Sequence, residues 1–75
     1  MIEELLKTGK TQDNRVYLLD KKYNPKHDVL KLTLLVTDEV DKHELQEDVK
    51  RYFREHRGIK LNKVKIKTIV GVRLN

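Results

Sequence analysis

The chain is predicted to be a single α+β domain in which one amphipathic helix covers one face of a three-stranded sheet, in the order short N-terminal helix, then β-β-α-β. Apolar residues alternate with polar ones over Val29–Thr37 and again over Lys63–Leu74, the period of a strand. Between Asp41 and Gly58 the apolar residues recur with a helical period. A length of 75 residues allows one domain.

The N-terminal segment Met1–Lys7 carries apolar residues at near-helical spacing. A helix this short is not stable alone in water, so it must dock or fray. Thr8–Asn14 is polar and is predicted to be a loop, which leaves residues 1–14 mobile if the helix finds no surface. Its Gly9-Lys10-Thr11 resembles the end of a phosphate-binding loop. However, Glu4 stands where the first glycine belongs, and no strand precedes the segment, so nucleotide binding is not expected.

The first two strands are predicted to form an antiparallel hairpin. Arg15–Asp20 is rich in β-branched and aromatic residues, as strands are. Lys21–Asp28 contains the one proline, after an asparagine, and is predicted to be a turn or short loop. Val29–Thr37 is the second strand. Because only eight residues join the two strands, an antiparallel pairing is the simplest connection.

The helix is predicted to begin after Asp41, whose side chain would cap it while Glu44 reaches back. Gly58 would end it in the left-handed conformation. The apolar stripe consists of Leu45, Val49, Tyr52, Phe53 and His56. Its position on this stripe predicts that His56 is a packed histidine.

The last strand, Lys63–Leu74, alternates most regularly, with apolar residues on one face and mostly basic residues on the other. A right-handed crossover would place it parallel to the second strand. Twelve extended residues span about 40 Å, whereas a chain of this size has a diameter of about 30 Å. The strand is therefore expected to overhang its neighbours or to bend at Gly71, and an overhanging edge favours pairing with a second copy.

The charge is unevenly distributed. Residues 1–48 contain eight Lys/Arg and eleven Asp/Glu, whereas residues 49–75 contain nine Lys/Arg and a single acid, Glu55. Such asymmetry often accompanies an anionic partner. Only 37% of the residues are hydrophobic and 39% are charged. Because so short a chain then has little apolar surface to bury, dimerisation is expected.

Several chemistries are not expected. The chain has no cysteine, serine or alanine, so the usual acyl-transfer nucleophiles and any thiolate metal site are missing. The acids near Asp41 suit a helix N-terminus, and the three histidines do not form a ligand set. We expect no enzyme activity, cofactor, metal or small-molecule substrate. No apolar run is long enough for a membrane span, and the absence of cysteine favours the cytoplasm.

Basic residues on the sheet suggest the leading hypothesis, a small non-enzymatic accessory protein that binds DNA or RNA through phosphate contacts. The residues proposed for this role are Lys31, Arg54, Arg57, Lys60, Lys63, Lys65 and Lys67. The alternative is a protein-interaction module, a homodimer or regulator that binds an acidic partner. Leu35 and Ile69 fall on the lysine face and invite a cover, either the N-terminal helix or a second subunit. Lysines on a strand also deter aggregation.

Overall fold

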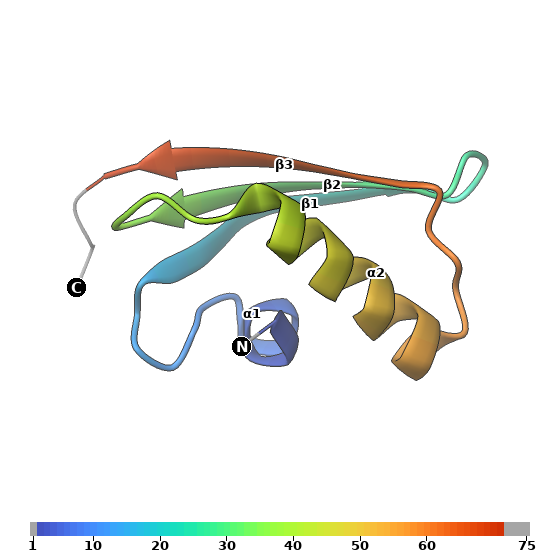
Figure 1. Ribbon diagram of the computed structural model, residues 1–75, viewed down its shortest axis with the longest axis horizontal. Helices are drawn as coiled ribbons and strands as arrows, with labels where there is room; N and C mark the ends of the chain where they lie inside the picture. Colours follow the sequence, from blue (N-terminus) through green and yellow to red (C-terminus); the bar gives the residue numbers. More distant parts are fainter. Residues whose placement is uncertain (1, 72–75) are drawn as a thin grey trace.

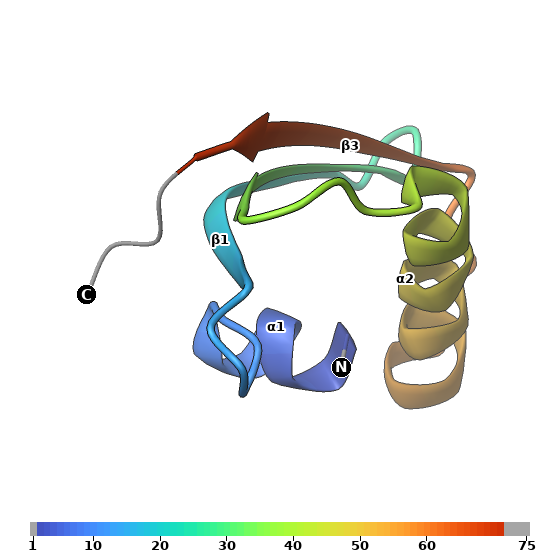
Figure 2. The same cartoon turned by 60° about the vertical axis from the view of Figure 1, so that its left-hand side comes forward.

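The computed structural model describes residues 2–71 and confirms the predicted α+β architecture (Figure 1). Its elements are α1 (Ile2–Thr8), β1 (Val16–Asn24), β2 (Val29–Val36), α2 (Lys42–Arg57) and β3 (Lys63–Val70). The sheet has the order β1-β2-β3, with β2 antiparallel to β1 and parallel to β3. Both helices lie on the same side of the sheet, as the second view also shows (Figure 2).

The hairpin is longer than the sequence predicts. β1 continues to Asn24, so the predicted loop 21–28 shrinks to a four-residue turn. Lys21–Asn24 has only one apolar residue, Tyr23, but its backbone pairs with Val29–Leu32, and this pairing decides its conformation. The register shifts between Leu18 and Asp20, which leaves Leu19 as a β-bulge.

The predicted roles of Asp41 and Gly58 as the caps of α2 are confirmed. The Asp41 carboxylate accepts a hydrogen bond from the Glu44 backbone N–H at 3.1 Å, and Gly58 is left-handed with φ 65°. The prediction for His56 is wrong: its side chain is exposed and stacks on Tyr52 with ring centroids 4.6 Å apart. The physical reason is that α2 moves away from the sheet towards its C-terminus (Figure 1), so its last turn has no sheet to pack against.

The core lies between the sheet and the two helices. Every second side chain of β2 is fully buried there, and Leu45 and Val49 of α2 pack against them. Leu5 of α1 is also fully buried in this cluster. Burying one leucine stabilises by roughly 1.5–3 kcal/mol, which anchors a helix too short to stand alone. Since α1 packs on the core side, it does not cover the opposite face of the sheet.

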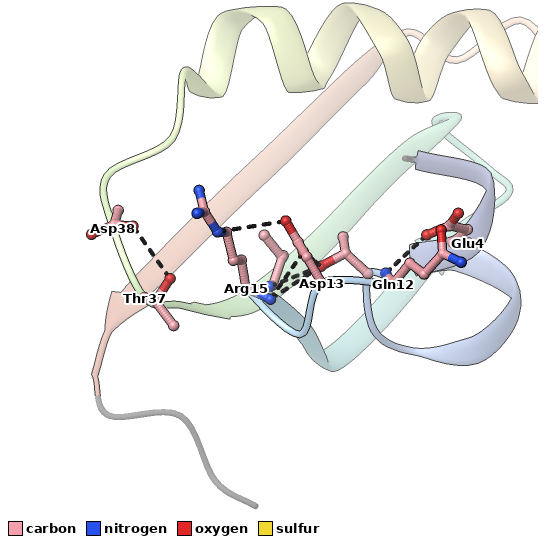
Figure 3. Close-up of polar contacts among 8 residues, drawn as sticks. Glu4, Gln12, Asp13, Arg15, Thr37 and Asp38 are labelled. Carbon is pink, nitrogen blue, oxygen red and sulfur yellow. Dashed lines mark hydrogen bonds and ion pairs between the residues drawn. The ribbon is translucent and has the colours of Figure 1, made fainter.

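The segment between α1 and β1 is held by hydrogen bonds around Thr11, which is only 3% exposed. Figure 3 draws the contacts of this segment, with Gln12, Asp13 and Arg15 labelled. The Thr11 hydroxyl donates to the Asp13 carboxylate at 2.7 Å and accepts from the backbone N–H groups of Arg15 and Val16, both at 3.2 Å. One residue along, the Gln12 N–H donates to the Glu4 carboxylate at 2.9 Å. Hydrogen bonds therefore connect the predicted loop to both α1 and β1.

The overhang predicted for the last strand is absent over the described residues. All eight residues of β3 pair with Val29–Val36, and the Gly71 N–H still donates to the Val36 carbonyl at 3.0 Å. The prediction that the strand continues through Val72–Leu74 falls outside the described residues. Within residues 2–71, neither helix is long and apolar enough to cross a membrane.

Candidate functional site

The sheet face opposite the helices, called the outer face, carries a group of exposed lysines. Because Leu30, Leu32 and Leu34 point into the core, the residues between them point outwards. The strand register then adds the residues that lie directly opposite on β1 and β3. The lysines among these outward-pointing residues are called the lysine cluster and are Lys22, Lys31, Lys63, Lys65 and Lys67.

The most crowded part of the lysine cluster is a single row across the sheet. Lys31 on the central strand lies directly opposite Lys22 on one side and Lys65 on the other. Like charges directly opposite each other destabilise a sheet. In the described part of the chain, the cluster makes one ion pair, between Lys22 Nζ and Asp20 Oδ2 at 4.0 Å, which is exposed and therefore weak. An anion bound over this row would relieve the repulsion.

Next to the lysine cluster lies an apolar row, formed by Tyr17, Leu35 and Ile69, which are directly opposite one another on the three strands. Ile69 is 43% exposed, and the other two are half-buried. Lys10 extends this row beyond the edge of β1, because it forms an isolated antiparallel bridge with Tyr17. The bridge is closed by hydrogen bonds from the Thr11 N–H to the Val16 carbonyl, 3.0 Å, and from the Leu18 N–H to the Gly9 carbonyl, 2.7 Å.

The seven predicted residues fall into separate groups. Four of them, Lys31, Lys63, Lys65 and Lys67, belong to the lysine cluster. Arg54 and Lys60 lie elsewhere, around a shallow hollow that they share with Lys50, Leu61 and Asn62. Arg57 is exposed at the end of α2. Because α2 packs on the other face of the sheet, the arginines and the lysine cluster do not form one surface (Figure 1).

The sequence pattern did not predict that two further lysines, Lys22 and Lys10, lie on the outer face. The sequence predicts a loop at Lys22 because the expected first strand ends at Asp20, whereas β1 continues to Asn24. A strand matched in length to its eight-residue partner would have included Lys22. Lys10 reaches the outer face through one isolated bridge, for which the sequence pattern gives no signal.

Two backbone N–H groups of the segment Gly9–Thr11 donate within the chain. The Gly9 N–H donates to the Leu5 carbonyl at 3.0 Å and closes α1, while the Thr11 N–H pairs with β1. A phosphate-binding loop needs such N–H groups to point at the phosphate. Neither the Gly9 N–H nor the Thr11 N–H is therefore available to a phosphate.

The acidic residues near the start of α2 rim an apolar pocket whose floor includes Leu5 and Leu45. Two of these carboxylates have structural roles: Asp41 caps the helix, and Asp48 pairs with Arg51 at 3.5 Å. Among residues 2–71, no three His, Cys, Asp or Glu side chains gather in a way that could hold a metal ion.

The perturbed pKa values come from local hydrogen bonds on the surface. The bond from Lys7 Nζ to Glu3, 2.8 Å, lowers the pKa of Glu3 and raises the pKa of Lys7. The Thr11 hydroxyl lowers the pKa of Asp13, and donation to Asp28 raises the pKa of Tyr23. The hydrogen-bonded partner is the largest cause of each shift.

Comparison with known proteins finds no match to the chain among family models, curated proteins or solved structures. The function is therefore inferred from the geometry of the outer face.

Proposed function

We propose that the protein is a small non-enzymatic accessory protein that binds nucleic acid, DNA or RNA, through the lysine cluster of the outer face. The observation that carries this proposal is the row of Lys22, Lys31 and Lys65, three like charges placed directly opposite one another on a face that neither helix covers. Such a row is unfavourable by itself and becomes favourable beside phosphates.

The dimensions of the lysine cluster suit a phosphate backbone. Lys63, Lys65 and Lys67 follow one another at two-residue steps, about 6.6 Å each, and neighbouring strands are about 4.8 Å apart. Five phosphate contacts would make log K fall with log salt concentration at a slope of about −3.5 for a single strand or about −4.5 for a duplex. Arg54, Arg57 and Lys60 would add contacts where a longer nucleic acid continues around the end of the domain.

The test is an anisotropy titration of labelled DNA and RNA at 20 mM and 200 mM salt. We expect binding at low salt that the double variant Lys31→Gln/Lys65→Gln weakens at least tenfold, with a salt slope reduced by about 1.4 to 1.8. Lys42→Gln removes one exposed lysine of α2 outside the lysine cluster and serves as a single-charge control, which should bind as the wild type does. No binding at low salt, or binding unaffected by Lys63/65/67→Glu, would exclude the proposal.

A second candidate function, a homodimeric interaction module, is favoured by the exposure of the apolar row, since α1 lies elsewhere. The acidic partner of such a module would contact the same lysines. Light scattering on the wild type and on Ile69→Asp separates the candidates. Loss of a dimer, with nucleic-acid binding that still depends on Lys31 and Lys65, supports the first function, whereas a dimer without any nucleic-acid binding in the wild type supports the second.

A further inference from the structure

We propose that the nucleic acid is single-stranded and that its bases lie over the apolar row while its phosphates contact lysines on either side. This inference rests on the proposed function and names its substrate class. It comes from a feature that phosphate contacts alone do not explain, namely that the apolar row continues the same face as the lysine cluster.

Lysines flank the apolar row on two sides. On β3, Lys67 is two residues from Ile69 and points to the same face. At the other edge, Lys10 lies directly opposite Tyr17, in the kind of antiparallel pair whose side chains approach most closely. The row from Lys10 to Ile69 crosses three inter-strand gaps, about 14 Å. At the stacked spacing of roughly 3.4 Å per nucleotide, this width accommodates about four nucleotides.

A duplex makes poor use of this surface. Its bases are stacked inside, and their edges are reached only by a helix, ribbon or arm that enters a groove. In the described residues both helices lie behind the sheet, so the outer face presents strands alone (Figure 2). Against a duplex, the apolar row would face phosphates and sugars. A single strand can turn its bases towards the protein, and its base faces pair well with an apolar surface beside positive charge.

The apolar row has one aromatic ring, Tyr17, and one well-exposed aliphatic side chain, Ile69. Ile69→Thr is the most informative substitution because threonine keeps the β-branched shape and removes apolar surface. Val70→Thr is the matched control: Val70 is the next residue of β3, is 59% exposed and points to the helix side. Both substitutions change the strand in the same way, and only one alters the outer face.

The experiment compares a labelled 12-nucleotide single strand with the duplex of the same sequence at 50 mM salt. We expect the wild type to bind the single strand at least tenfold more tightly. Ile69→Thr should weaken single-strand binding about threefold to fivefold without changing the salt slope or duplex binding. Val70→Thr should leave both single-strand binding and duplex binding unchanged. Lys65→Gln should weaken binding of both the single strand and the duplex and reduce the single-strand salt slope by about 0.7.

The possible failures are distinguishable. Equal affinity for the two substrates, still dependent on Lys65, would overturn the single-strand inference and leave the proposed function standing. Absence of binding to either substrate, even at 20 mM salt, would overturn both. If Ile69→Thr instead dissociates a dimer and leaves single-strand affinity unchanged, the apolar row is a contact between subunits and the inference is wrong.

Discussion

Removing one lysine from the crowded row should stabilise the protein when no nucleic acid is present. Lys65 lies directly opposite Lys31, whereas Lys63, two residues earlier on the same strand and face, lies opposite Val29. Like charges directly opposite cost about 0.2–1 kcal/mol, and Coulomb's law in water gives about 0.7 kcal/mol for tips about 6 Å apart. We therefore expect Lys65→Thr to be more stable than Lys63→Thr by about 0.5 kcal/mol.

The assay is thermal unfolding followed by circular dichroism at 10 mM and 500 mM salt. For a domain of this size, about 0.5 kcal/mol corresponds to about 2–4 °C in Tm. Lys63→Thr is a close control because it shares the strand, the face and the change in strand propensity with Lys65→Thr. The difference should shrink at high salt, where charges on the surface are screened. Lys31→Thr removes the charge that has lysines on both sides, so of the three threonine variants it should show the largest rise in Tm at low salt.

Two results would refute this reasoning. Equal stability of Lys63→Thr and Lys65→Thr at low salt would mean that the row is not under electrostatic strain. A difference between the two variants that persists unchanged at 500 mM salt would assign the effect to packing or strand propensity rather than to charge.

The remaining predictions concern the fold that supports the outer face. Leu34→Ala, at a fully buried position of the central strand, should cost about 2–5 kcal/mol in urea unfolding and leave most molecules unfolded at 37 °C; a cost below about 1 kcal/mol would contradict the described core. Gly58→Ala should cost about 1–2 kcal/mol, measured the same way, because φ is 65° there, and a neutral change would contradict the left-handed cap. The pKa of Asp13 is lowered by the Thr11 hydroxyl, so this bond supports the fold above the ordinary value of 3.8 and its contribution is lost as pH falls through the lower folded value. Thr11→Val should bring the Asp13 titration, followed by NMR, back towards 3.8, and an unchanged titration would contradict the assignment.

The elements that the sequence predicted well are those with local signals. Apolar periodicity predicted four of the five elements, and β-branched and aromatic residues predicted β1. Asp41 and Gly58 marked both ends of α2 because caps are decided by neighbouring residues. Parallel pairing of β3 followed from the crossover connection. The alternation of β2 and β3 was enough to place Lys31 and Lys65 on the same face.

The errors arose where the conformation depends on a distant partner. Lys21–Asn24 is a strand because β2 runs beside it, although its own residues do not alternate. His56 follows the helical stripe, but the tilt of α2 leaves it exposed. Lys10 reaches the outer face through a single bridge to Tyr17. The pattern of apolar residues predicted the face of the helix on which His56 lies, but it predicted no face for Lys21–Asn24 or Lys10. In all three cases the packing of the elements against one another decided the environment of the residue.

The most direct test of the central claim is the map of backbone amide chemical shifts in a ¹H–¹⁵N spectrum during addition of a short oligonucleotide at low salt. We expect the largest changes on the outer face, at Lys22, Lys31 and Lys65, with little change at Leu45 and Val49 in the core contact of α2. Changes confined to the exposed side of α2, or no change at saturating oligonucleotide, would contradict the proposal that the lysine cluster binds nucleic acid.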